Sequence, residues 1–171
     1  VDNPSRKSLR LHPELAAQRK TELALFDRIL PMARYVGEVG LDGSPQLAGS
    51  WDEQVRVFEH VLAACASAGG KTLSIHSRRA ELEVLSRLEA APGVGTPVLH
   101  WFSGSLRALE RAVGCGCWFS VGPQMLRAQK GRTLVTAMPR DRILTESDGP
   151  FTVHEGRPAM PWDVHSAVLE L

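Results

Sequence analysis

Side chains that bind metal ions follow several short apolar runs of this sequence. His76 follows LSI, His100 follows PVL, Glu38 comes after RYV, and Asp148 comes after RIL. Imidazole suits zinc or a similar transition metal, whereas carboxylates also accept manganese or magnesium and can bridge two ions. Taken singly, a histidine at a strand end is more often structural, and the aspartate of SDGP is by default a turn former. Four such residues at four strand ends together predict a divalent metal site.

The apolar runs alternate with amphipathic stretches, which predicts a parallel sheet, and the continuously apolar strands indicate that both faces of the sheet are covered. A (β/α)8 barrel and an open doubly wound sheet both fit this alternation. The carboxyl ends of barrel strands converge on one face, whereas an open sheet spreads them along an edge. Convergence makes the polar strand ends one site, so we expect the barrel. The six expected strands lie near LRLHP (9–13) and within 33–40, 72–76, 96–102, 117–122 and 141–148.

Helix signals separate these runs. Apolar residues spaced 4, 3, 4 and 3 apart predict a helix over 50–70, with Ser50 and Glu53 as a capping box and Gly69-Gly70 as its end. Ser105 should cap a helix that carries Leu106, Leu109 and Val113. A further helix is expected over 14–30, and its inward-facing residues would be Leu15, Leu23, Phe26, Ile29 and Leu30.

The length falls short of a whole barrel. A barrel of about 250 residues uses roughly 31 per βα unit, so 171 residues supply about five to six of the eight units. We therefore expect one metal-binding barrel domain over 1–171 that is incomplete at its N-terminus by one or two βα units. The last helix, which begins in PWDVHSAVLEL, should also be cut short.

Composition limits the partners and the location. The net charge is +1, from 20 Lys+Arg against 19 Asp+Glu, so no global field attracts nucleic acid or membrane. Any site for a polyanion must therefore be local. Three cysteines without a C-x-x-C pair favour a reducing cytoplasm, and the sequence shows no signal peptide or membrane span.

Five motifs resemble, in order and spacing, those of the TatD-like metal-dependent deoxyribonucleases, which are (β/α)8 hydrolases. They are VGEVGLD, SIHSR, LHWFSG, CWFSVG and LTESDGPF. More narrowly, HSRRA, HWFSGS, DGPF and MPWDV resemble the TatD-like subunit of the Qat anti-phage defence system, which implies protein partners in a defence complex.

The resemblance implies a role for each matching residue. Glu38 would bridge two divalent ions (Mg, Mn or Zn), His76 and His100 would bind one ion, and Asp148 would bind the other and orient or deprotonate the attacking water. Family members have two further histidines, an H-x-H after the first strand, which this sequence lacks. That difference agrees with the expected loss of the first unit. His12 resembles a substrate-side histidine.

Other residues remain open between two uses. Arg78 is a candidate phosphate clamp or a surface salt bridge. Ser103 and Ser120 could bind phosphate or cap turns, and Asp42 could orient a metal ligand from behind. Aromatic residues after a strand could stack a nucleobase, although they more often fill the space between barrel and helices. The two aromatic residues in question are Trp101 and Phe102. No catalytic role is expected for Lys71, His60, His154, His165, Cys115 and Cys117.

The function that these inferences favour is hydrolysis of DNA phosphodiester bonds, starting from single-stranded ends. One alternative keeps the metals but acts on a small ester, an amide or a nucleobase, because the same ligands activate water for any electrophile. Another is a non-catalytic barrel subunit docked in a defence complex. The missing H-x-H favours this last alternative, whereas the ligand set Glu38, His76, His100 and Asp148 opposes it.

Overall fold

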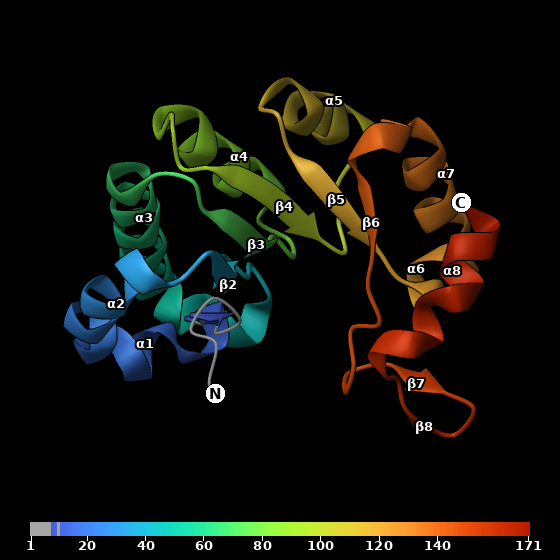
Figure 1. The fold of residues 1–171 in the computed structure, drawn as a ribbon, viewed down its shortest axis with the longest axis horizontal. Coiled ribbons are helices and arrows are strands. Elements are labelled where there is room, and N and C mark those ends of the chain that lie inside the picture. The colour runs from blue at the N-terminus through green and yellow to red at the C-terminus, as the bar shows by residue number, and fades with distance from the viewer. Residues whose placement is uncertain (1–7, 10) are drawn as a thin grey trace.

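The computed structural model describes residues 8–9 and 11–171. Its main feature is a sheet of six parallel strands, whose order across the sheet is their order in the chain (Figure 1). The predicted barrel-type α/β fold is thus confirmed. Arg10, within the first expected strand, lies outside the described residues. The strands are β1 (Ser8–Leu9), β2 (Tyr35–Gly40), β3 (Thr72–His76), β4 (Thr96–His100), β5 (Trp118–Val121) and β6 (Ile143–Thr145).

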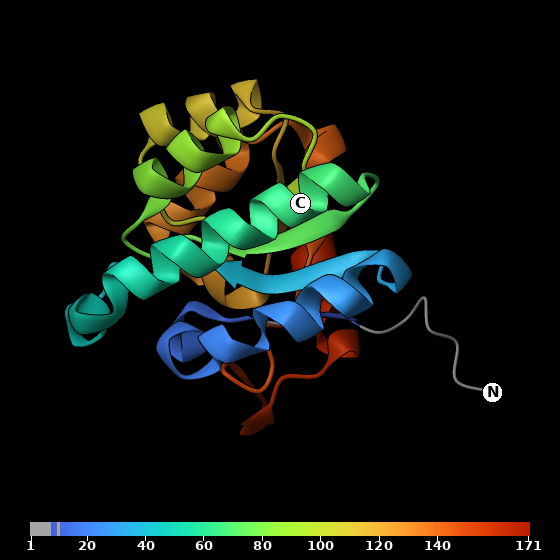
Figure 2. The same ribbon diagram turned by 90° about the vertical axis from the view of Figure 1, so that its left-hand side faces the viewer.

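Helical connections join each strand to the next. Helices α3, α4, α5 and α7 lie along the outside of the curved sheet, and α3 runs beside the strands in Figure 2. Strands β1 and β6 are the two edges of the described sheet and do not pair with each other, so one side of the arch is open. The connecting helices are α1 (Ala16–Arg19), α2 (Leu23–Ile29), α3 (Trp51–Ala68), α4 (Glu81–Ala90), α5 (Leu106–Gly114), α6 (Pro123–Arg127) and α7 (Gln129–Ala137).

A continuous apolar core fills the space between the sheet and these helices. Leu73 and Ile75 of β3 are fully buried, while the intervening residues of β3 are half-buried. One face of the strand therefore packs against helices and the other faces the inside of the arch. The strands were expected to be buried on both faces, but β6 is not, because its Leu144 is 41% exposed. Strand β6 is at the edge of the sheet, with no strand beside it on one side among the described residues.

The long helix α3 matches its prediction in extent. It ends before Gly69, whose positive φ of 66° is a backbone conformation that glycine adopts without strain and that does not continue a helix. The predicted capping box at Ser50 is wrong, because the Ser50 side chain makes no capping hydrogen bond. Residues 45–50 already form a 3₁₀ turn, in which Ser50 Oγ donates to Leu47 O and accepts from Gln54 Nε2. Ser105, in contrast, caps α5 as predicted, accepting from the Ala108 N–H.

The helix predicted over 14–30 is interrupted. A 3₁₀ turn at Lys20–Glu22 separates α1 from α2, and 3₁₀ turns at Pro13–Leu15 and Leu30–Met32 flank the pair. Leu15 is 38% exposed rather than inward-facing, and Ala16 is buried in its place. A 3₁₀ turn advances about 120° per residue instead of about 100°, so three residues rotate the buried stripe by about 60°. That rotation brings Ala16 and Phe26 toward the same core.

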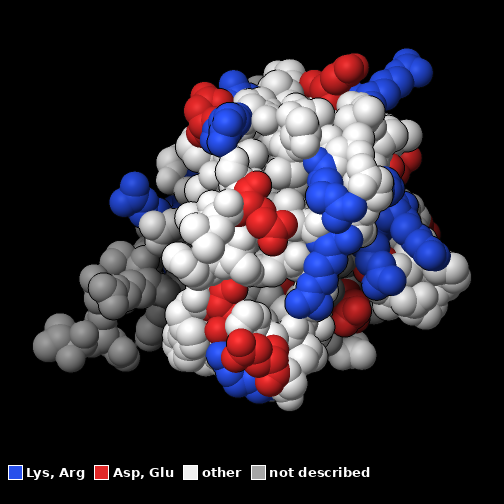
Figure 3. Space-filling view, turned by 90° about the vertical axis from the view of Figure 1, so that its right-hand side faces the viewer, with Lys and Arg blue, Asp and Glu red and all other residues white. Residues whose placement is uncertain are grey.

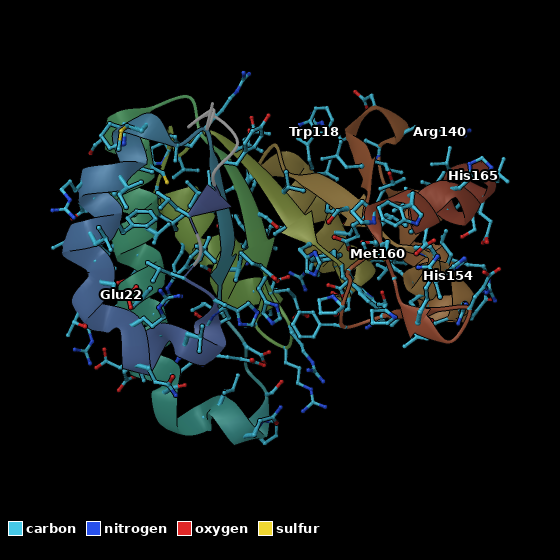
Figure 4. All side chains as sticks on the ribbon, turned by 60° about the horizontal axis from the view of Figure 1, so that its bottom comes forward. Glu22, Trp118, Arg140, His154, Met160 and His165 are labelled. Atoms are coloured by element: carbon cyan, nitrogen blue, oxygen red, sulfur yellow. The ribbon has the colours of Figure 1, made fainter. Side chains whose placement is uncertain are left out.

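After β6 the chain forms an antiparallel hairpin of β7 (Val153–His154) and β8 (Arg157–Pro158), then a 3₁₀ turn at Pro161–Val164 and α8 (His165–Glu170). His154, Met160 and His165 all lie in this C-terminal part, on the other side of the molecule from Glu22 (Figure 4). Among the described residues, no helix combines the length and apolarity needed to cross a bilayer.

Candidate metal centre

A cleft of about 450 Å³ opens at the carboxyl ends of the strands. It brings together the four predicted metal ligands, which arrive from β2, β3, β4 and the segment after β6. The predicted substrate residues His12, Arg78 and Ser103 also line it. The complete lining is His12, Glu14, Glu38, Asp42, His76, Ser77, Arg78, His100, Trp101, Ser103, Asp148 and Phe151.

Glu38 occupies the centre of the polar cluster. Its Oε1 lies 3.0 Å from His76 Nδ1 and 3.8 Å from His100 Nε2, while its Oε2 lies 3.9 Å from His12 Nε2. The two oxygens of one carboxylate therefore face different imidazoles. This is the arrangement expected of a carboxylate that can bridge two cations.

Two glycines of β2 allow this position of Glu38. The pairing of β2 with β3 shifts register between Val36 and Val39, so the backbone bulges at Gly37–Glu38 and re-aims the side chain. Gly40 has φ +135°, and a Cβ there would lie 2.1 Å from His76 O. Only glycine permits so close an approach of the two strands.

A buried carboxylate, that of Asp42, forms a hydrogen bond with the His76 ring on the side opposite Glu38. His76 Nε2 lies 2.8 Å from Asp42 Oδ2, and Asp42 is only 2% exposed. Asp42 Oδ1 accepts a hydrogen bond from the Ser44 N–H, while Gln54, fully buried on α3, accepts one from the Asp42 N–H. A carboxylate can only accept, so Nε2 donates to Asp42, while Nδ1 faces Glu38 in the cleft. The His76 ring thus lies between Glu38 on one side and Asp42 on the other.

His100 has an equivalent partner that sequence reasoning missed. Its Nδ1 lies 2.5 Å from Glu146 Oε2, and its Nε2 lies 3.2 Å from Asp148 Oδ1. Glu146 also accepts hydrogen bonds from Ser120 Oγ at 2.6 Å and from the Trp101 N–H at 3.2 Å. Glu146 thus orients His100 as Asp42 orients His76. The sequence carries the signal in TESD, where two carboxylates, Glu146 and Asp148, follow one strand.

Electrostatics favour positive charge at this centre. Burial lowers the pKa of His100, but hydrogen bonds to Asp148 and Glu146 outweigh burial and raise that pKa to about 10. The pKa of His76 is also raised, because Glu38 and Asp42 outweigh its burial. Burial opposes ionisation of Glu38, yet the hydrogen bond to His76 and the charge of His100 lower its pKa. His12 differs, since burial is the largest influence and lowers its pKa.

The structure places two predicted residues away from the cleft. Ser120 is buried and its hydroxyl is used by Glu146, so it supports His100 rather than facing a substrate. Phe102 is also fully buried, with its ring edge-on to Phe119 at 5.9 Å between centroids. It fills the space between barrel and helices, the second of its two expected uses. Trp101 lines the cleft, together with Phe151, which the sequence did not single out.

The residues given no catalytic role lie elsewhere. Lys71 precedes β3, at the opposite end from His76, and its buried ammonium donates to Leu30 O and Ala33 O. His60 lies 2.8 Å from Asp27 on the surface. Cys117 is buried as expected, whereas Cys115 is only half-buried.

The donor set fits a divalent cation. Ligand atoms of His12, Glu38 and His76 all lie within 4.8 Å of one another, a span that one ion can bridge with small side-chain adjustments. His100 Nε2 and Asp148 Oδ1, which lie 3.2 Å apart, form a second pair of donors, and His100 Nε2 approaches the same oxygen of Glu38 as His76 does. Nitrogen and carboxylate oxygen ligands together suit zinc or manganese.

Parallel strands whose carboxyl ends deliver histidines and carboxylates to one cleft define the class of barrel-type metal-dependent hydrolases. A family model described as TatD related DNase matches residues 6–171, so this chain belongs to that family.

Individual relatives agree with this assignment. Deoxyribonuclease TATDN3 of Homo sapiens is 29% identical over 157 residues, which are 86% of this chain and 57% of that protein. The 3'-5' ssDNA/RNA exonuclease TatD of Pantoea vagans is 29% identical over 148 residues, 82% of this chain and 56% of the relative. The crystal structure of YJJV, a TatD homologue from Escherichia coli K12, matches with a TM-score of 0.84 at 26% identity and covers 95% of this chain and 66% of that one. The chain therefore spans a little more than half the length of these two curated relatives.

Proposed function

We propose that this chain carries the catalytic centre of a two-metal phosphodiesterase that removes nucleotides from the ends of single-stranded DNA. The observation that carries the proposal is the position of Glu38, with one oxygen toward His76 and His100 and the other toward His12. The names of the human and Pantoea relatives, a deoxyribonuclease and a single-strand exonuclease, support the choice of substrate.

The proposed ligands are Glu38, His76, His100 and Asp148, with Glu38 shared between two ions. Divalent ions bound there would lower the pKa of water and stabilise charge on the attacking and leaving oxygens. Asp148, which lines the cleft beside His100, would orient the attacking water and accept its proton. Asp42 and Glu146 would keep the two imidazoles in the tautomers that leave His76 Nδ1 and His100 Nε2 free for the ions.

Phosphate recognition is proposed for residues at the cleft rim. The Arg78 side chain is exposed, lines the cleft and has no ion-pair partner among the described residues, so its guanidinium is available for bidentate phosphate binding. Ser103 lines the same cleft and could donate a further hydrogen bond. His12 would contact either the substrate or, through Nε2, an ion beside Glu38.

Metal removal tests the proposal. The full chain is expected to degrade a linear single-stranded oligonucleotide in Mg²⁺, Mn²⁺ or Zn²⁺, to lose this activity in EDTA and to regain it when metal is restored. A circular single strand of the same sequence should remain intact, because it has no end. Products are resolved on a denaturing gel. Intact linear DNA in all three metals, beside an active relative, would contradict the proposal; a parallel panel of small esters and amides would then reveal the alternative substrate class.

A narrower proposal places the protein in an anti-phage defence complex in the cytoplasm. It rests on the resemblance of HSRRA, HWFSGS and MPWDV to a subunit of the Qat system, and all three cysteines are free thiols, as a reducing compartment requires. Val168 and Leu169 of α8 are 52% and 74% exposed, which provides apolar surface for a protein partner. Purification from native cells should recover stoichiometric partners, and recovery of this protein alone would refute the idea.

A further inference from the structure

Two aromatic side chains line the mouth of the cleft. Phe151 comes three residues after Asp148 and is 86% exposed, and Trp101 directly follows His100. A phenylalanine ring that stays in water loses the stabilisation of about 1.5–3 kcal/mol that burial would provide. Phe102 and Phe119 are completely buried, so the core does accept such rings. The Phe151 ring is therefore available to a ligand that enters the cleft.

Trp101 is held firmly in place. Its φ of 38° is in the left-handed region, which bulky residues seldom occupy. Its backbone N–H donates to Glu146 Oε1, and the half-buried ring packs against the core. Glu146 in turn orients His100. The position of this aromatic surface is therefore set by the same carboxylate that sets a proposed metal ligand.

Positive charge lies beside the two rings. Lys130 Nζ donates to Ser103 O at 2.5 Å, which places an ammonium group at the cleft rim without a carboxylate partner among the described residues. Arg78 lies on the rim as well, also without an ion pair in that part of the chain. Figure 3, which shows the face that carries α7 and α8, has Lys and Arg side chains gathered side by side over one part of it. Aromatic faces next to cations are the combination that binds single-stranded nucleic acid.

We propose that Trp101 and Phe151 stack on unpaired bases at a single-stranded end, while Arg78 and Lys130 hold the neighbouring phosphates. The inference rests on the proposed function and adds a basis for its selectivity, since bases inside a duplex do not offer their faces. Stacking does not depend on base identity, so the preference would be for single strands and not for a sequence.

Binding to two matched oligonucleotides tests this inference. One has natural bases throughout, and the other has the same length and charge but abasic tetrahydrofuran residues at its last three positions. Affinity is measured by fluorescence anisotropy with the metal-loaded full chain carrying Asp148→Asn, which prevents turnover. Phe151→Ala should weaken binding to the natural strand by about 5- to 150-fold, the range for one lost stacking contact. Binding to the abasic strand should not change.

Two further variants complete the design. Phe151→Tyr should restore affinity, and Trp162→Ala, which removes another ring that is 67% exposed but does not line the cleft, should change nothing. Equal losses on both strands, or no loss on either, would overturn the stacking role. If DNA is hydrolysed and binds independently of Phe151, this inference alone fails. If Phe151 controls binding but no DNA is hydrolysed, stacking stands and the proposed reaction fails.

Discussion

Glu38→Gln is expected to reduce the proposed metal-dependent hydrolysis by about 1,000-fold, because ions held by Glu38 would supply several kcal/mol of transition-state stabilisation and each 1.36 kcal/mol is a factor of ten. The substitution keeps the shape of the side chain but removes the charge that faces His12, His76 and His100. Metal affinity should fall in parallel. Initial rates on single-stranded DNA and isothermal titration with Mn²⁺ measure the two effects.

Glu59→Gln is the matched control for this variant. Glu59 is an exposed carboxylate on α3 that pairs with Arg87, away from the cleft. Its substitution should leave both rate and metal affinity unchanged. If Glu38→Gln kept more than a tenth of the wild-type rate at saturating metal, Glu38 would not lie between the ions.

Gly40→Ala is expected to destabilise the fold by about 3 kcal/mol, from a strained backbone and an overpacked contact. The added methyl would lie 2.1 Å from His76 O while φ is +135°, so β2 and β3 must separate. That separation also displaces His76 from Glu38, and DNA hydrolysis should fall together with stability. Urea denaturation, with the midpoint and slope measured separately, gives the change in the free energy of unfolding.

The control is the same substitution at a glycine without these constraints. Gly114 is the last residue of α5, and a Cβ there has no heavy atom within 4 Å. Gly114→Ala should be neutral or stabilise by up to about 1 kcal/mol, because alanine has the better helix propensity. Equal losses at the two glycines would show that the close approach of β2 to β3 is not what requires Gly40.

The local rules that succeeded were those in which a few adjacent residues decide the outcome. Gly69 ends α3 because its own φ is positive, and Ser105 caps α5 through a bond three residues ahead. Where two local signals competed, the prediction was wrong. Ser50 has the sequence of a capping box, yet Gln54 and a preceding 3₁₀ turn use its hydroxyl.

The sequence by itself determined the alternation of strands and helices and the residue types at the strand ends, since both depend on short-range patterns of apolar and polar side chains. These patterns were enough to predict that Glu38, His76, His100 and Asp148 meet at one end of the sheet. Only the tertiary structure decided which oxygen of Glu38 faces which histidine, that Glu146 supports His100, and that Phe151 is left in water while Phe102 is buried. Those outcomes depend on the curvature of the sheet and on contacts between residues dozens of positions apart, which no local spacing encodes.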